Sequence, residues 1–599
     1  MNLNAESYFS MTPSLDISRS KFDMSHGIHS SGCVGDIIPI EIMPVYPGDT
    51  FEYKTNAIFR LQPLVAPLMD DITVDIYWFY APMRILWEKT KEFFGENTSG
   101  PWAPAVEYAI PNLNVPRKDI TSDYSDIATG KKVYLIGVPP KSIGDYLGIP
   151  TNTKVTNDGT EAFLTAHPEL IYVDDTDYTL LSDNLLIDVL PFRMYGMIYN
   201  EYLRSEALQN PVVVPLSSSS AVGFPADTDL STLDPITATC AGGALLKACK
   251  KFDYFTGALP NPQRRADPVM ALPNSYVYFG ATRDASAVVD AHDLAMSSVV
   301  RNTGTEASPT YGRVTNGFTV TSSSQSPSNF NIVSAGNKFQ PDNWMIDGVS
   351  VEQIRVAFQV QKFYEATARS GGRYREILES LFHVHASDQS MQIPQFLGSE
   401  QFYLNINQVL QTSESGTTPQ GNPAGISVTQ HSGFDFIHSF TEHGYIMGLA
   451  IARYHHTYQQ GIQRFWHRSN KFDFYFPQFA NIGEQPIRND EIMFTGSTYD
   501  SDVFGYQEAW ADMRYKPSIV TGEMRSNVQN SLDMYHLADD YNGLVFLGDK
   551  WIQEDKKMLD RCLAVTSDVA DQFWFDMYFD CKATRPLPVH SIPGLVDHH

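Results

Sequence analysis

Cysteine is scarce in this chain. It occurs at five of 599 positions, and no two of these have CxxC spacing: Cys33, Cys240, Cys249, Cys562 and Cys581. An odd number of widely spaced thiols argues against a disulfide framework and against a structural zinc site. We expect free, buried thiols in a protein that is made and kept under cytoplasm-like, reducing conditions.

Long apolar runs are absent too. One of the longest, Tyr445–Ala452, falls well short of the roughly 20 residues that span a bilayer. The first 22 residues lack a basic head followed by an apolar stretch, so no secretory signal is expected there. The sequence therefore predicts a soluble protein without membrane insertion.

Positive charge is in short supply. The chain has 43 Lys and Arg against 69 Asp and Glu, which gives a formal net charge of −26. Because phosphate contacts need local positive charge, so acidic a surface does not bind duplex DNA nonspecifically over its whole area. Any nucleic-acid-binding surface must therefore be a local patch of positive charge on an otherwise acidic protein.

The usual catalytic motifs are missing as well. The sequence has no GxSxG elbow, no Walker-type phosphate loop, no GxGxxG after a strand and no HExxH. We therefore assign no catalytic or cofactor-binding residues and expect that the protein is not an enzyme.

Metal-ligand patterns are weak. His383 and His385 continue a helical period, on which residues two apart point about 200° from each other. His455 and His456 are adjacent and would face opposite sides of a strand. The acidic loop Asp174–Asp177 lacks the glycine and glutamate of an EF-hand. We expect no resident metal; a divalent cation that bridges subunits at such a loop remains an open alternative.

The residues that are abundant favour strands and turns. Aromatic residues make up 12% of the chain, and 39 Gly and 36 Pro supply turns. In the clearest strand, residues 71–80, Ile72, Val74, Ile76 and Trp78 alternate with polar residues before both faces become apolar. This pattern predicts a strand that enters the interior of a β sandwich partway along.

Strand signals lie near both ends of the chain. After residue 431 they recur at Phe434–Ile437, Tyr445–Ala452, Phe472–Phe476 and Gln572–Phe579. Core strands in about 30–80 and 431–599 imply that the two ends pair in one sandwich, which is the non-local topology of a jelly roll. We predict one domain, residues 1–599, with large insertions.

Helical periodicity lies between these two sets of strand signals. We expect a short helix between Pro82 and Gly95, an amphipathic helix over Tyr195–Leu203, and a helix after Ser350 that is broken at Gly371 and then resumes. These helices would pack against a sheet. They fall in two predicted helical and loop insertions, 84–210 and 346–398.

Two stretches lose all periodicity and fill with Ser, Thr, Asn, Gly and Pro. They are about 211–240 and about 264–345. A stretch of that length in a compact protein is either disordered or a functional surface element.

One region combines positive charge with aromatic residues. Basic side chains reach phosphates while aromatic faces stack on unpaired bases, so this mixture suits single-stranded DNA. The candidate DNA contacts are Arg453, His455, His456, Arg464, His467, Arg468 and Lys471, with a weaker second cluster of Arg514, Lys516 and Arg525. Alternatively, the aromatic residues are core and the arginines pair with carboxylates of the subunit. The sequence leaves both interpretations open.

A series of strings, in the same chain order, resembles one protein family. The strings include Arg19–His26, Pro47–Phe51, Asp75–Pro82, Arg373–Glu376, Ile393–Gly398, Phe440–Gly444, Thr457–Gly461, Phe472–Pro477, Phe504–Glu508, Ala583–Pro588 and Ile592–His598. Together they resemble the major capsid proteins of gokushoviruses, small single-stranded DNA bacteriophages of the Microviridae. The chain departs from the family at Phe382–Val384, where the usual pattern is Phe-Gly-Val.

The resemblance implies a viral eight-stranded antiparallel β-barrel jelly roll. It also implies sixty copies in a T=1 icosahedral virion around circular single-stranded DNA, assembled in the host bacterial cytoplasm. A large insertion would form a protrusion at the threefold axes and attach to the host. We assign it to 264–345, whose composition suits a variable surface.

The resemblance also implies partners. Besides other copies of the chain and the genome, they are a small basic DNA-packaging protein, a DNA pilot protein, a scaffolding protein during assembly and a host cell-surface receptor. Since each copy carries a charge of −26, the shell cannot neutralise its genome, and the packaging protein, polyamines or divalent ions must supply cations.

The alternative from another class is a carbohydrate-active or adhesive β-sandwich protein, suggested by the aromatic and acidic loops. Such an enzyme needs two carboxylates about 5–9.5 Å apart in a cleft.

Overall fold

The computed structural model describes residues 19–96, 108–115, 117–174, 185–218, 243–263, 277–281, 300–302, 311–315, 319–320, 339–344, 351–371, 373–414, 420–421 and 423–590. The chain divides into two compact units. Unit 1 comprises Met1–Pro262 and Thr367–His599, and unit 2 comprises Gln263–Ala366.

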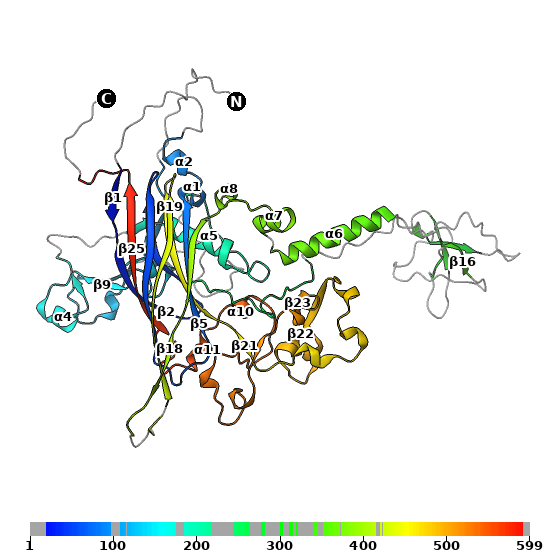
Figure 1. Ribbon diagram of the computed structural model, residues 1–599. Coiled ribbons are helices and arrows are strands. Elements are labelled where there is room, and N and C mark those ends of the chain that lie inside the picture. Colours follow the sequence, from blue (N-terminus) through cyan, green and yellow to red (C-terminus); the bar gives the residue numbers. More distant parts are fainter. Residues whose placement is uncertain are drawn as a thin grey trace. The chain divides into compact units, whose positions relative to one another are not determined.

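Eight principal strands in the described part of unit 1 form two antiparallel sheets (Figure 1). One sheet has the order β2–β25–β4–β19, and the other has the order β17–β5–β20–β3. Because β2, β3, β4 and β5 alternate between the sheets, as do β19, β20 and β25, the connectivity is that of a jelly roll. The bounds are β2 His26–Gly32, β3 Ile37–Val45, β4 Thr50–Leu61, β5 Ile72–Pro82, β17 Gln395–Tyr403, β19 Pro423–Ser439, β20 Gly444–Tyr454 and β25 Phe573–Arg585.

The last strand lies inside the first sheet. β25 pairs antiparallel with β2 on one side, where Phe579 lies opposite His26, and with β4 on the other, where Phe579 lies opposite Thr55. In Figure 1 the red β25 accordingly runs beside blue strands. β1 (Ser20–Asp23) also pairs with β25, and β18 (Ile406–Leu410) extends the far edge beyond β19. The predicted pairing of the two ends is confirmed.

Aromatic side chains fill the space between the sheets. Trp78, from β5, is fully buried, and its ring centroid lies 4.7 Å from that of Tyr53, 5.6 Å from that of Phe436 and 5.6 Å from that of Phe579. These four rings come from four different strands, two of them separated by most of the chain. Tilted and edge-to-face ring pairs at such distances add to the free energy of burial.

The outer face of the second sheet is covered as well. Helix α5 (Leu190–Ile198), which runs on into a π-helical turn at Tyr199–Leu203, and the short α1 (Met83–Leu86) pack there against Phe79 and Leu449. The Tyr195 hydroxyl donates to the Ile37 carbonyl of β3 at 2.8 Å. This cover explains why strand 71–80 becomes apolar on both faces.

The predicted helices differ in how they pack. α5 confirms the prediction for Tyr195–Leu203, whereas α7 (Tyr374–Phe382) has no buried residue and does not pack into a core. α7 ends before His383, which takes the left-handed conformation, so the expected continuation of the helix through His385 is wrong. Other helices are α2 (Thr90–Phe93), α6 (Val351–Arg369) and α8 (Asp388–Met391).

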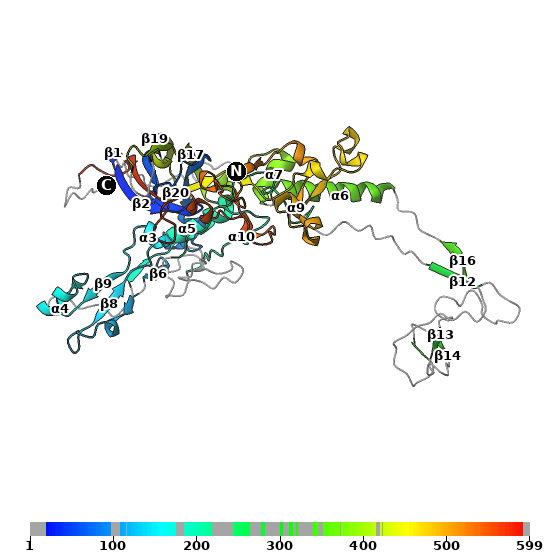
Figure 2. The same cartoon turned by 90° about the horizontal axis from the view of Figure 1, so that it is seen from below.

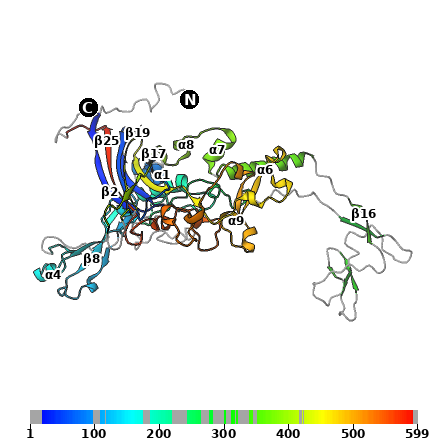
Figure 3. The same cartoon turned by 60° about the horizontal axis from the view of Figure 1, so that its bottom comes forward.

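Strands also occur where only helices and loops were expected. Within 84–210, a four-stranded sheet and α4 (Glu161–Ala166) surround a small core of their own (Figure 3). Its strands are β7 Arg117–Asp119, β8 Val133–Ile136, β9 Thr153–Thr156 and β10 Ile171–Tyr172. β17 and the start of β19 lie outside both ranges predicted for core strands.

Unit 2 contains the segment 264–345 and the first part of α6. Its described strands form two small antiparallel sheets, β12 with β16 and β13 with β14 and β15 (Figure 2). Their bounds are β12 Val277–Ala281, β13 Val300–Asn302, β14 Tyr311–Thr315, β15 Thr319–Val320 and β16 Phe339–Trp344. Most of the other non-periodic stretch, 211–240, lies outside the described residues.

The strand predicted at Phe472–Phe476 is wrong. Lys471–Asp473 forms a 3-10 turn, and the Asp473 carboxylate accepts from the backbone N–H groups of Ser469 at 2.8 Å and Asn470 at 2.6 Å. The acid that gave the apolar–polar alternation of a strand therefore closes a turn instead. The aromatic side chains that follow are exposed.

The thiols of Cys33, Cys249, Cys562 and Cys581 are free, and burial raises the pKa of each to about 11. Cys240 lies outside the described residues. Among the helices described, none has the length and apolar character needed to cross a membrane.

Candidate nucleic-acid interface

Two of the ten candidate DNA contacts are held inside the subunit. Arg453, on β20, donates to the Asp75 carboxylate at 2.5 Å and to the Tyr77 hydroxyl at 3.0 Å, and all three side chains lie on the same sheet. Asp75 is one of the polar residues that alternate with the apolar ones in β5, yet it is 2% exposed and pairs with Arg453.

His456 is buried between two carboxylates. Its Nδ1 lies 2.9 Å from Asp539, its Nε2 lies 2.9 Å from Glu554, and its side chain is 1% exposed. Burial alone would lower the pKa of His456, but the two carboxylates outweigh it and raise the pKa to about 9. Asp539 also accepts from Lys250 at 2.9 Å and from Tyr541 at 2.7 Å.

The buried network removes His456 from the candidate surface. A doubly protonated imidazole has two N–H donors, and both are used within the subunit. Its neighbour His455 is exposed, and burial of part of the ring lowers its pKa, so His455 is neutral near pH 7. The two adjacent histidines therefore differ in environment and in charge: His456 is buried and positive, and His455 is exposed and neutral.

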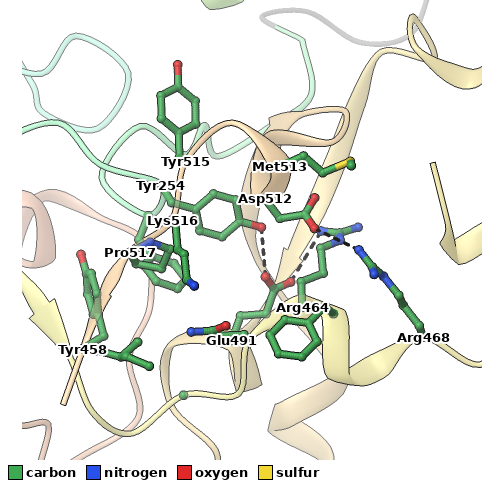
Figure 4. Close-up of a pocket in the computed structure, with 15 residues that line it drawn as sticks. Tyr254, Tyr458, Arg464, Arg468, Glu491, Asp512, Met513, Tyr515, Lys516 and Pro517 are labelled. Carbon is green, nitrogen blue, oxygen red and sulfur yellow. Dashed lines mark hydrogen bonds and ion pairs between the residues drawn. The ribbon is translucent and has the colours of Figure 1, made fainter. Parts of the chain in front are cut away.

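The structure brings the two predicted basic clusters together at one pocket. The pocket has a volume of about 240 Å³, and Arg464 and Arg468 of the first cluster line it together with Lys516 of the second (Figure 4). Aromatic walls come from Tyr254, Phe255, Tyr458, Phe465 and Tyr515. We call this site the Arg464 pocket.

Carboxylates partly neutralise the two arginines. Arg464 lies 3.6 Å from Glu491, whose side chain is 2% exposed, and Arg468 lies 3.9 Å from Asp512. Burial raises the pKa of Glu491 although Arg464 opposes the shift. Pairing with carboxylates of the subunit, which was the alternative interpretation for the arginines, therefore occurs at Arg464 and Arg468 as well as at Arg453. Lys516 is exposed and forms no ion pair with any described residue.

A glycine allows the pocket floor to form. An added Cβ at Gly461 would lie 1.9 Å from the Glu491 carbonyl oxygen, so no larger residue fits without moving the backbone. Gly461 therefore lets the chain before Arg464 lie directly against α9 (Asn489–Ile492), which carries Glu491.

The remaining candidates do not line the pocket. Their contacts within the subunit are ion pairs of His467 with Asp490 at 3.5 Å and of Arg514 with Glu508, a hydrogen bond from Arg525 to the Gln459 carbonyl at 3.0 Å, and a cation–π contact of Lys471 with Phe472. Trp466, beside this group, is 72% exposed.

Sequence reasoning missed the residues that complete the pocket. Tyr254 and Phe255 follow Lys250 and Lys251, and that mixture of basic and aromatic residues was a usable signal. Glu491 carried no local signal, because its role depends on a Tyr254 hydroxyl from a distant segment that donates to it at 3.0 Å.

Within the described ranges, no group of three or more His, Cys, Asp or Glu side chains is arranged to hold a metal ion. Most of the acidic loop Asp174–Asp177 lies outside those ranges, so the cation proposed to bridge subunits there stays a prediction.

Comparison with known proteins gives the family. A sequence model described as capsid protein (F protein) matches residues 10–139 and 158–595, which is nearly the whole chain. The chain belongs to this capsid protein family. A capsid protein has a structural role and is located in the virion.

Similar proteins extend over the full length of this capsid protein. Capsid protein VP1 of Spiroplasma virus 4 is 34% identical over 99% of this chain and 98% of its own. VP1 of Bdellovibrio phage phiMH2K is 32% identical and VP1 of Chlamydia phage 1 is 31% identical, each over 98% of this chain and 97% of its own. The resemblance to gokushovirus major capsid proteins is confirmed.

Proposed function

We propose that sixty copies of this capsid protein assemble in the host cytoplasm into a T=1 icosahedral shell that encloses circular single-stranded DNA. The supporting observation is its similarity, over 97–98% of their lengths, to capsid proteins of three small phages. A jelly roll whose two chain ends pair in one sheet is a closed building block suited to such a shell.

Exposed aromatic residues support contacts between copies. Trp466, Phe472 and Phe474 are 72%, 60% and 51% exposed and lie close together in the sequence. Apolar area of this kind marks surfaces that become covered, and stable pairing needs about 800 Å² per partner. Electron microscopy of the purified protein tests the proposal: closed particles support it. A discrete monomer that hydrolyses glycans would favour the carbohydrate-active alternative.

Unit 2 is the proposed threefold protrusion and the part that attaches to the host. A variant with 264–345 shortened should still fold and form particles, because the jelly roll and both of its cores lie in unit 1. Adsorption of those particles to host cells should be lost. Particle yield and cell binding are the measurements, and loss of soluble subunits on the deletion would refute the assignment.

The packaged genome needs cations from a source other than the capsid protein. The net charge of −26 on each copy supports a small basic packaging protein, polyamines or divalent ions as the main source. A pilot protein and a scaffolding protein complete the proposed set of partners. The capsid protein's own DNA contacts would be local, at the Arg464 pocket.

Charge reversal at Arg468 should yield particles with less DNA. Arg468 contacts the subunit through a 3.9 Å ion pair to Asp512 and a cation–π contact with Phe474, so reversal would mainly remove the proposed phosphate contact. Arg464 is a poorer choice, because its reversal would place a second carboxylate against the buried Glu491. The ratio of absorbance at 260 and 280 nm of purified particles measures the effect. Lys132→Glu, directly before β8 of the small sheet, is the matched control, and equal DNA content in both variants would contradict the prediction.

A further inference from the structure

The Arg464 pocket has a carboxylate at its floor and cations at its mouth. Glu491 lines it with a side chain that is 2% exposed, whereas Lys516 is exposed and Arg468 is partly exposed. Figure 4 shows Arg464 and Arg468 on the side of Asp512, with Lys516 across from them. A ligand that fills the pocket therefore meets positive charge outside and an acceptor inside.

The Glu491 carboxylate retains room for one more donor. Its Oε1 accepts from the backbone N–H of Arg488 at 3.1 Å and lies 3.6 Å from Arg464, and its Oε2 accepts from the Tyr254 hydroxyl at 3.0 Å. A carboxylate offers about four acceptor positions. Hydrogen bonds fill two of them and the Arg464 guanidinium lies beside a third, which leaves a position on Oε2 for an N–H group of a ligand.

The walls between floor and mouth are aromatic. Phe465 and Tyr515 are 43% and 39% exposed, and both line the pocket together with the buried Tyr458 and Phe255. Exposed rings beside a basic mouth are what a single unpaired base uses for stacking, with its phosphate outside. An apolar peptide side chain would fill the same walls but would leave the mouth cations unused.

We propose that the Arg464 pocket holds one unstacked nucleotide of the packaged strand and prefers cytosine to thymine, with Lys516 and Arg468 at the phosphate and Glu491 at the amino edge of the base. The inference rests on the proposed packaging of single-stranded DNA. Cytosine and thymine have similar size, but cytosine presents an N4 amino donor where thymine presents the O4 acceptor. An acceptor facing Glu491 would be repelled, whereas an amine would complete the carboxylate's contacts.

The test uses the full-length protein and short fluorescent oligo(dC) and oligo(dT) strands, measured by anisotropy at several salt concentrations. The wild type should bind oligo(dC) about tenfold more tightly than oligo(dT). Glu491→Gln should reduce that ratio to near one, because an amide offers a donor as well as an acceptor. The variant should fold, since glutamine can also accept from the Arg488 N–H at the start of α9.

Lys516→Ala separates the phosphate contact from the base contact. It should weaken both oligonucleotides alike and reduce the salt slope by about 0.7, without changing their ratio. The remote Lys132→Ala should change neither quantity. Thermal unfolding and particle formation of each variant check that the fold is kept.

The outcomes distinguish this inference from the proposed function. Equal binding of the two strands by the wild type, or an unchanged ratio in Glu491→Gln, would overturn the cytosine preference while DNA-filled particles still supported the capsid function. An unchanged salt slope in Lys516→Ala would overturn the phosphate contact. Particles that form without DNA, from a protein that binds neither strand, would instead count against packaging itself.

Discussion

Replacing His456 with glutamine should lower the free energy of unfolding of the subunit by about 3 kcal/mol at pH 6.5. The side chain is 1% exposed, and its two ring nitrogens lie 2.9 Å from Asp539 and 2.9 Å from Glu554. Without the positive charge of His456, the negative charges of the two buried carboxylates are less well neutralised. This costs more stability than the loss of an ordinary hydrogen bond. Lys250 still pairs with Asp539, so the carboxylate of Glu554 suffers the larger loss.

The loss of stability in His456→Gln should be larger at pH 6.5 than at pH 9.5. The folded-state pKa of His456 is about 9, above the ordinary value of 6.5, so protonated His456 stabilises the folded form. This contribution, about 3 kcal/mol, is fully present below pH 6.5 and is lost as the pH rises through about 9. The stability difference between wild type and His456→Gln should therefore shrink between these values. Urea unfolding at pH 6.5, 8 and 9.5 measures it.

The adjacent histidine supplies the control. His455 is exposed and has a lowered pKa, so His455→Gln should change the free energy of unfolding by less than about 0.5 kcal/mol at any of these pH values. If the wild type and His456→Gln differ by the same amount at pH 6.5 and 9.5, protonated His456 does not hold the two carboxylates.

The alternation of apolar and polar residues correctly predicted strands that have one face buried in the core. Residues 71–80 and 572–579 alternate because one face of each meets the aromatic core, and both form strands, β5 and β25. The same alternation failed at Phe472–Phe476, where Asp473 caps a turn and none of the described strands pairs with the segment. Alternation shows which side chains are apolar, but a strand also needs a neighbouring strand with which to pair.

The candidate site was predictable in composition and not in arrangement. Arg453, His456 and Arg464 have the same appearance in the sequence, yet their partners Asp75, Asp539 and Glu491 come from other segments. Whether a basic residue is buried with a carboxylate or left at a surface is decided by those distant partners. The sequence therefore indicated a basic and aromatic region but could not separate the residues that hold the subunit together from those that line the pocket.

Met577→Asp should prevent the subunit from folding. Met577 is fully buried on β25, between Ile28 of β2 and Ala57 of β4, and it belongs to the core between the two sheets. A carboxylate there has no described cation or donor with which to pair, and its burial costs more than about 4 kcal/mol, a large part of the stability of a typical domain. Soluble yield and far-ultraviolet circular dichroism are the measurements.

The next residue provides a matched substitution. Tyr578 is 49% exposed on the other face of the same strand, so Tyr578→Asp should fold and lose no more than about 1 kcal/mol. Equal stability of the two variants would mean that β25 does not pass through the core. If the two differ as expected, the jelly roll cannot close until its last strand has been made, since β2 and β4 meet only through β25. Only complete chains would then present the surfaces that join copies into a shell.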